Sequence, residues 1–437
     1  MSKPVKSSDN GGHGPRNVAL VGPYGSGKTS LLESLLAASG TIHRKGSVTQ
    51  KNSVGDTSAE ARAREMSVEV NCATAEFMGE TFTFLDCPGS IEFLADTLNV
   101  LPGVDAAIVV CEPEAAKVQM LKPYLKRLED LQIPHFLFVN KIEKAAGSLR
   151  ELLAFLQEAS ETPLLLRQIP IWEKGAVTGF VDLALERAFV YRPHQPSEVI
   201  DMGGETERQK EARFSMLEKL ADYNEHLMEE LLSDIEPPRD EVFDDLAKEL
   251  AGGLVVPVLM GSAEGDNGVR RLLKALRHEV PQVDAVATRL GVGDGGDAVV
   301  QILKTYHSSH GGKMSLARVL CGSLKDGAVL RGRDGKEARI GGIFSLRGDA
   351  QTKLGEAKAG DVVGLGRLEG VQTGETLRAG AGKIPKVEVE SLSPVFSLAI
   401  AAPDRKDEVK LSAAIAKLCE EDPSLGFEQN ADLHEMI

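Results

Sequence analysis

The sequence of 437 residues has few cysteines, few aromatic residues and no long apolar run. Its five cysteines are scattered without a Cys-x-x-Cys pair, which argues against a zinc ribbon or a disulfide framework and favours a reducing compartment. No run of about 18 apolar residues occurs and the N-terminus lacks an apolar signal core, so we predict no membrane span and no secretion. These absences favour a cytoplasmic protein.

Positive charge is also scarce. The chain has 50 Lys and Arg against 65 Asp and Glu, a net charge of −15, which argues against general duplex binding through a basic surface. Residues 201–250 alone hold sixteen Asp or Glu and six Lys or Arg. Helical spacing from Leu217 to Leu231 allows two interpretations, a solvated helical face with an apolar inner stripe or a docking surface for a basic partner.

The first half of the chain alternates short apolar runs with segments of helical spacing. Such alternation predicts an α/β domain with a mainly parallel sheet, which binds its ligands at the carboxyl ends of the strands. The apolar runs are 17–22, 82–86, 106–110, 135–140 and 255–259.

The second half of the chain has a different pattern of apolar residues and turns. Between 298 and 384, short β-prone runs alternate with Gly turns, as is typical of an all-β barrel. Beyond 394 we predict a strand over Val395–Ile400 and a helix around 406–420, the start of an α+β domain. The predicted organisation is a disordered tail over 1–16, a first domain over 17–283 with an insertion at 144–255, a linker over 284–297, a barrel over 298–388 and a truncated third domain over 389–437.

One motif is specific enough to predict chemistry. Residues 22–29, Gly-Pro-Tyr-Gly-Ser-Gly-Lys-Thr, fit the pattern G-x-x-x-x-G-K-[ST] between a strand and a helix. The glycines let backbone amides face phosphate oxygens, and the helix N-terminus adds positive potential. Lys28 is expected to reach the β- and γ-phosphates of a nucleotide, and Thr29 to ligate Mg²⁺.

Three weaker motifs follow later strands in an order that supports this interpretation. Asp86 in Asp86-Cys87-Pro88-Gly89 can hold Mg²⁺, and Gly89 permits close approach of its backbone to a γ-phosphate. The carboxylate in Asn140-Lys141-Ile142-Glu143 can accept from the N1–H and amino group of guanine, a donor pair that adenine lacks. Ser262-Ala263 can present a backbone amide to the guanine oxygen.

In this order the motifs resemble those of translational GTPases of the elongation factor G class. The resemblance covers about residues 17–430, and the long stretch between Asn140 and Ser262 resembles the inserted subdomain of elongation factor G. Further resemblances to the family's barrel and third domain lie at 312–319, 359–362, 373–377 and 412–423. The family continues into two more domains, so we expect this chain to be an N-terminal fragment of a monomeric factor.

The resemblance implies a P-loop GTPase domain that uses GTP or GDP and Mg²⁺ and acts on the ribosome, on rRNA and ribosomal proteins. The residues implied for catalysis are Lys28, Gly89 and Ser90, and those for Mg²⁺ are Thr29, Ser67 and Asp86. The residues implied for nucleotide binding are Gly22, Gly25, Ser26, Gly27, Lys28, Thr29, Ser30, Asn140, Lys141, Glu143, Ser262 and Ala263.

Four departures from the family pattern point to a divergent paralogue. Ser90 replaces the His that positions the attacking water, with Glu92 or Asp96 as candidates to compensate. Arg64-Glu65-Met66-Ser67 replaces Arg-Gly-Ile-Thr in the first switch, Glu143 replaces the Asp that binds guanine, and Gly25 stands where many members have Asp.

Three functions therefore remain open at this stage: a ribosomal GTPase, a nucleotide-regulated binding module that hydrolyses very slowly, and another P-loop phosphotransferase that uses ATP. Within the first, translocation, recycling, rescue and drug protection are equally open.

Overall fold

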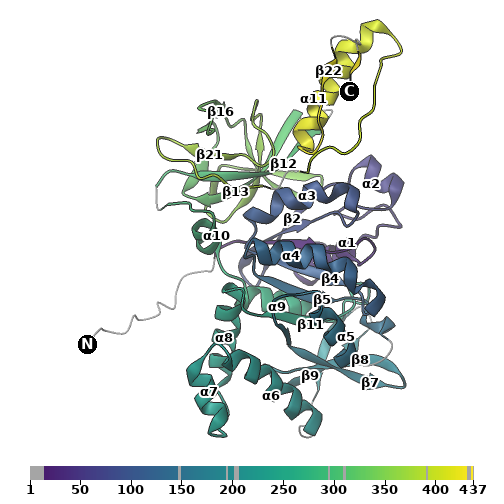
Figure 1. The fold of residues 1–437 in the computed structure, drawn as a ribbon, viewed down its shortest axis with the longest axis vertical. Helices are drawn as coiled ribbons and strands as arrows, with labels where there is room; N and C mark the ends of the chain where they lie inside the picture. Colours follow the sequence, from purple (N-terminus) through teal and green to yellow (C-terminus); the bar gives the residue numbers. More distant parts are fainter. Residues whose placement is uncertain are drawn as a thin grey trace, which may run out of the picture.

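The structure is a computed structural model, and it arranges the chain as an elongated molecule with α6 (Glu207–Ala221) and α7 (Glu225–Leu232) at one end and α11 (Glu408–Glu421) at the other (Figure 1). None of the helices in its described segments is long and apolar enough to cross a membrane. The structure describes residues 14–145, 149–192, 195–200, 206–293, 296–308, 312–389, 392–430 and 435–436.

The first domain is built on a parallel sheet with one antiparallel edge strand, β2, and it confirms the predicted α/β class. Successive residues of its first strand face opposite layers, so that Val18 and Leu20 pack with leucines of the helices α1 and α9, and Ala19 and Val21 with those of α4. In spatial order the strands are β2 (Asn71–Phe77), β3 (Glu80–Asp86), β1 (Arg16–Val21), β4 (Ala106–Cys111), β5 (His135–Val139), β11 (Val256–Met260) and β6 (Leu164–Leu166).

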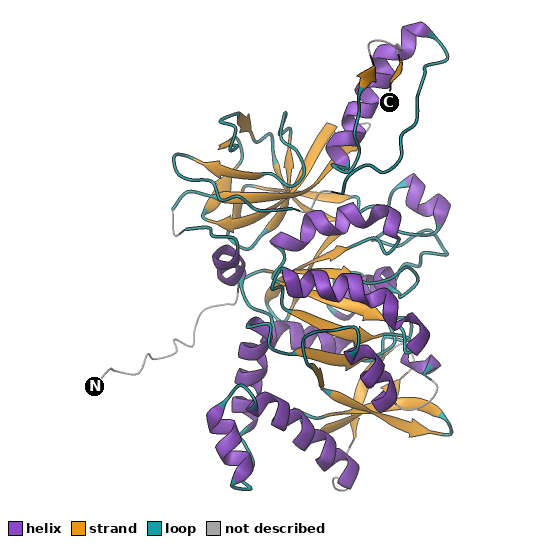
Figure 2. Cartoon of the chain, in the orientation of Figure 1, coloured by secondary structure: helices purple, strands orange, loops and turns teal. Residues whose placement is uncertain are grey.

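Helices cover both faces of this sheet (Figure 2). The α-helices are α1 (Lys28–Ala38), α2 (Ala59–Arg64), α3 (Leu94–Val100), α4 (Lys122–Asp130), α5 (Leu149–Gln157), α9 (Val269–Glu279) and α10 (Val283–Arg289). Short 3₁₀ turns connect several of them, at η1 (Ile91–Phe93), η2 (Leu101–Gly103), η3 (Ala115–Leu121) and η4 (Ile142–Lys144).

Two predicted boundaries differ from the structure, the first because Arg16 pairs with Phe82 of β3 and the second because of apolar packing. The strand β1 begins at Arg16, inside the predicted tail, and residues 1–13 lie outside the described segments. The predicted linker begins as the helix α10, because Val286 and Ala287 pack against the barrel residues Val299 and Leu320. Residues 294–295 of that linker lie outside the described segments.

The insertion is shorter than the predicted 144–255. α5 and β6 belong to the first domain, because β6 pairs in parallel with β11, so the chain leaves the main sheet at Gln168. A small antiparallel sheet and three acidic helices then form a separate core around Leu217 and Leu246. The elements are β7 (Gln168–Glu173), β8 (Ala176–Asp182), β9 (Arg187–Arg192), β10 (Gln195–Ile200), α6, α7 and α8 (Arg239–Ala251).

The predicted all-β barrel is confirmed as a set of antiparallel strands around one apolar core. A single pair, Arg347 of β17 with Ala73 of β2, joins its sheet to that of the first domain. Its strands are β12 (Val299–Ser308), β13 (Gly312–Cys321), β14 (Ser323–Lys325), β15 (Val329–Arg331), β16 (Glu337–Arg339), β17 (Ile343–Arg347), β18 (Ala350–Leu354), β19 (Glu356–Lys358), β20 (Val362–Gly366) and β21 (Thr376–Ala379).

The last segment contains the predicted helix but not the predicted strand. η5 (Arg405–Asp407) and α11 cover the expected helix, followed by the short strands β22 (Gln429–Asn430) and β23 (Glu435–Met436). The prediction of a strand over Val395–Ile400 is wrong, because Val395 is 99% and Phe396 78% exposed, residues 395–399 have no strand pairing, and only Ile400 makes an isolated β-bridge. An extended segment without a neighbouring strand has no partner for its backbone groups.

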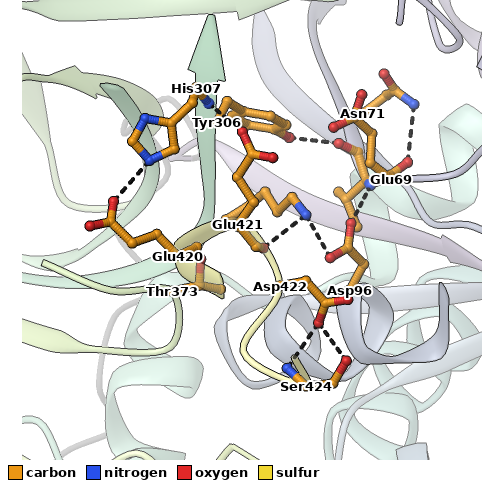
Figure 3. Close-up of polar contacts among 12 residues, drawn as sticks. Glu69, Asn71, Asp96, Tyr306, His307, Thr373, Glu420, Glu421, Asp422 and Ser424 are labelled. Atoms are coloured by element: carbon orange, nitrogen blue, oxygen red, sulfur yellow. Dashed lines mark hydrogen bonds and ion pairs between the residues drawn. The ribbon is translucent and has the colours of Figure 1, made fainter. Parts of the chain in front are cut away.

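Two buried ion pairs attach the barrel to the first domain. Arg318 of β13 donates to both oxygens of Asp105 at 2.8 and 2.7 Å, and both side chains are fully buried. Lys304 of β12 donates to Asp96 of α3 at 2.7 Å and to the Glu421 carbonyl at 3.0 Å, so that three parts of the chain meet at one ammonium group (Figure 3). Buried pairs of this geometry hold the parts in one orientation.

Candidate functional site

The glycine-rich loop between β1 and α1 curves because its glycines adopt left-handed conformations. Gly22, Gly25 and Gly27 have φ angles of +136°, +78° and +93°. A side chain at Gly22 would overlap the Val110 carbonyl, and one at Gly27 would overlap the Asn140 amide. Only glycine fits at positions 22 and 27. The loop ends at Gly27, which caps the N-terminus of α1. Ser26 is buried in this loop, whereas Ser30 lies one turn further on and is exposed.

Lys28 extends back along the inside of this loop. Its Nζ donates to the carbonyls of Gly22 at 2.9 Å and Pro23 at 3.1 Å, and the residue is 6% exposed. Burial lowers the pKa of Lys28, while Asp86 opposes that shift. A side chain at Gly89 would overlap this Nζ, so the loop after β3 lies directly against the ammonium group. The structure therefore brings Lys28 and Gly89 together.

The three residues predicted to bind metal also meet. The Thr29 hydroxyl donates to Asp86 at 2.7 Å, and it lies 3.1 Å from the Ser67 hydroxyl. Asp86 is the last residue of β3, and Ser67 lies in the segment that follows α2. Burial, followed by the nearby Asp56 carboxylate, raises the pKa of Asp86 to about 7.

Asp56 belongs to the same cluster and was missed by the sequence analysis. It is 2% exposed, and burial raises its pKa, while the Ser67 hydroxyl opposes that shift. Asp86 Oδ1 and both carboxylate oxygens of Asp56 are buried without a hydrogen-bond partner among the described residues. Buried carboxylate and hydroxyl oxygens are the ligands that hard divalent cations prefer, so this set fits Mg²⁺. Nothing near Asp56 in the sequence distinguishes it from an ordinary loop aspartate.

The segment that carries Asp56 is tied to α1 by Glu33. The two carboxylate oxygens of Glu33 accept from the backbone amides of Gly46 and Val54, and the residue is 1% exposed. This contact spans 21 residues of sequence. Helical spacing alone cannot reveal a partner that far away, so the sequence analysis missed this residue as well.

A second cluster forms beside the loop from the ends of β5 and β11. Asn140 donates to the Ser26 carbonyl at 2.9 Å and accepts from the Ala263 amide at 2.9 Å. Lys141 Nζ donates to the Gly25 carbonyl at 2.7 Å. The backbone of Ser262 pairs with that of Asn267, which closes the turn that presents Ala263. The predicted base-binding residues therefore meet, apart from Glu143.

Glu143 lies on the 3₁₀ turn η4 and is exposed. It makes no hydrogen bond among those of the described residues, and its charge is, after burial, one cause of the raised pKa of Tyr191. Its pairing with guanine stays a prediction.

The segment after Gly89 is more open. Ser90 is half-buried, and its hydroxyl donates to the carboxylate of exposed Glu92, while Tyr124 donates to the Gly89 carbonyl at 3.3 Å. The suggestion that Asp96 could orient water is wrong, because Asp96 is 4% exposed and accepts from Lys304 and from the Val70 amide. Figure 3 shows this carboxylate enclosed in the junction with the barrel.

Three family models match successive parts of the chain. The model for the elongation factor Tu GTP-binding domain matches residues 13–282, that for elongation factor G domain 2 matches 297–380, and that for elongation factor G domain III matches 393–437. The chain belongs to the translational GTPases of the elongation factor G class.

Individual relatives of this elongation factor G-like chain belong to the same class by name or are similar to it in structure. It is 45% identical over 425 residues to an elongation factor G-like protein of Synechocystis sp., covering 97% of this chain and 62% of that protein. It is 28% identical to elongation factor G 2 of Desulfotalea psychrophila, covering 97% of this chain and 63% of the relative. A crystal structure from Thermus thermophilus superposes with a TM-score of 0.86 at 28% identity, over 96% of this chain and 63% of that one. The chain thus spans somewhat under two thirds of the length of these relatives.

Proposed function

We propose that this elongation factor G-like chain binds GTP and GDP with Mg²⁺, and that it hydrolyses GTP as part of a cytoplasmic translation factor that acts on the ribosome. The observation that carries the proposal is the meeting of Lys28, Thr29, Ser67 and Asp86 around one glycine-rich loop. A monomeric state and the ribosomal partner remain predictions that rest on family membership.

Each group at the site would have one task. Backbone amides of the loop and the Lys28 ammonium group would bind the phosphates, and Lys28 would exchange its carbonyl partners for phosphate oxygens. Thr29, Ser67 and Asp86 would hold Mg²⁺, with Asp56 accepting from its water ligands. A bound Mg²⁺ would neutralise charge on the phosphates. Asn140 and Lys141 would order the loop beneath the base.

A second function is favoured by one observation. Because the Ser90 hydroxyl donates its one proton to Glu92, it can act only as an acceptor toward a water in that arrangement. A binding module that exchanges nucleotide and hydrolyses it very slowly is therefore the alternative to an efficient GTPase.

Single-turnover hydrolysis with and without purified ribosomes separates the two functions. Ribosome-stimulated turnover supports the GTPase, whereas tight binding with no stimulated turnover supports the binding module.

Competition of labelled GTP by unlabelled GTP and ATP tests the choice of base. A pocket built to pair with the guanine donors rejects a base that lacks them. Equal potency of ATP would contradict the guanine assignment and favour another P-loop phosphotransferase.

A further inference from the structure

Glu112 is a nearly buried carboxylate at the end of β4, directly beside the second cluster of the site. Its side chain is 8% exposed, and it forms ion pairs with two lysines, Lys117 of η3 and Lys141 after β5. Burial raises the pKa of Glu112, but the hydrogen bonds from Lys117 and Lys141 outweigh it and leave the pKa below its usual value. A buried carboxylate between two ammonium groups is ionised and fixed in place.

Lys141 is held at both ends. Its backbone is left-handed, with φ +56°, a conformation that non-glycine residues rarely adopt. Its ammonium group donates to the Gly25 carbonyl at 2.7 Å and also pairs with Glu112. The Lys141 side chain is 27% exposed, so part of it stays open to solvent beside the glycine-rich loop.

We infer that Glu112 is a positioning residue for nucleotide recognition, which stretches Lys141 between β4 and the glycine-rich loop so that its methylene stem forms a flat platform for the base. This inference rests on the proposed function. The carboxylate acts through Lys141 and does not touch the nucleotide. Lys117 supplies the second positive charge and keeps Glu112 directed at the loop.

The geometry favours positioning over simple support of the fold. A flexible lysine loses side-chain entropy when a ligand fixes it, and a lysine that is already fixed does not. Glu112 joins elements that are neighbours in the sheet in any case, because β4 pairs with β5 from Ala107 to Cys111. The ion pair is thus not needed to bring these strands together.

The chain offers a matched control in Glu114. It lies two residues further on, pairs with the same Lys117 at 3.2 Å and is 48% exposed, but it has no ion pair with Lys141 among the described residues. Loss of Glu114 removes a carboxylate of the same type from the same segment without releasing Lys141.

The test is a double-mutant cycle on GDP affinity, measured by displacement of a fluorescent GDP. We expect Glu112→Gln to raise the Kd for GDP about tenfold, mainly through faster dissociation, and Glu114→Gln to leave it unchanged. In the Lys141→Met background, Glu112→Gln should have no further effect. A loss of the same size in both backgrounds, or no loss in either, would overturn the inference.

Thermal unfolding of each variant serves as the control for a loss of stability. If Glu112→Gln does not fold, Glu112→Asp keeps the charge with a shorter reach, and the same cycle decides. If the parent chain binds no GDP, the proposed function fails. If it binds GDP and discriminates against ADP but Glu112→Gln changes nothing, only the positioning role fails.

Discussion

Buried carboxylates in this molecule fall into two groups, and the difference shows where ligands belong. Asp105 lies between the first domain and the barrel, and each of its oxygens accepts from Arg318. Asp56 and Asp86 lie at the glycine-rich loop, and three of their four oxygens have no partner among the described residues. Burying a charge is unfavourable unless it is paired, and where several unpaired carboxylate and hydroxyl oxygens lie in one cluster, as they do here, they fit a hard cation. The first group connects two domains, and the second offers its oxygens to a ligand.

The largest expected effect comes from breaking a pair of the first group. Arg318→Met leaves Asp105 buried without its cation, and removal of one partner from a buried pair costs about 3–5 kcal/mol. Urea unfolding should show that loss. The double variant Arg318→Met with Asp105→Asn should recover part of it, and failure to do so would mean that packing of Arg318, rather than its charge, stabilises the interface.

The next largest effect is expected on the rate of GTP hydrolysis, when Ser90 is replaced. A well-placed group that orients the reacting water contributes about 10²–10³-fold in such sites. Ser90→His should therefore raise the ribosome-stimulated single-turnover rate by on the order of 10²-fold. A parent rate that is already fast and falls on substitution would show that Ser90 and Glu92 position water in their own way. Glu92→Gln then measures the contribution of the exposed carboxylate.

A carboxylate of the second group should behave in the opposite way to Asp105. Asp86→Asn removes an unfavourable buried charge, so without Mg²⁺ the variant should be as stable as the parent or slightly more stable. Titration of GDP with and without Mg²⁺ should show that the parent gains affinity from Mg²⁺ and the variant does not, a difference of about tenfold or more. Equal gains would exclude Asp86 from the metal site.

Lys28 tests the phosphate side of the same cluster. Charge-assisted hydrogen bonds contribute about 1.5–3 kcal/mol each, so Lys28→Ala should weaken GTP binding by about tenfold to a hundredfold. Isothermal titration with GTP and Mg²⁺ measures the change. Unchanged affinity would contradict the assignment of the loop to phosphate binding.

The smallest effect is expected at Glu249 of α8, a buried carboxylate with no hydrogen-bond partner among the described residues and no proposed ligand. Burial raises its pKa to about 8, so its contribution to stability is present below about pH 4.5 and is lost as the pH rises through 8. Glu249→Gln should therefore stabilise the chain by about 1–2 kcal/mol at pH 9 and by little at pH 5. Thermal unfolding across this range checks it, with exposed Asp244→Asn as the control.

The acidic insertion remains the least determined surface. α6 to α8 bury the stripe around Leu217 as predicted, while Glu225 and Glu229 are exposed on α7. Both interpretations from the sequence, a solvated face and a docking surface for a basic partner, agree with this arrangement.

Local patterns in the sequence were sufficient for the loop and for five strands of the first domain, but not for β2 or β6. Gly22, Gly27 and Lys28 form a contiguous motif, and Asp86 and Asn140 each end an apolar run. Because parallel strands share one carboxyl edge, a list of strand ends already predicts which side chains meet. The family's second and third domains were also recognisable from short motifs.

Other features depend on contacts between distant segments. Asp56 lies in the cluster because Glu33 of α1 binds the backbone of its segment. The role proposed for Glu112 depends on its ion pairs with two lysines on other elements. The predicted strand over Val395–Ile400 shows the converse, since β-prone residues form a strand only when a neighbouring strand is there to pair with them.

The sequence by itself thus determined the fold class, the phosphate loop and the family of this chain, because each depends on residues that are adjacent or regularly spaced. The tertiary structure alone decided which carboxylates are paired and which are open. Asp96 and Asp86 are both buried aspartates of the same segment, yet Lys304 reaches one and no lysine or arginine forms an ion pair with the other among the described residues. Whether a buried charge is satisfied depends on distant partners, and only the folded chain brings these into contact.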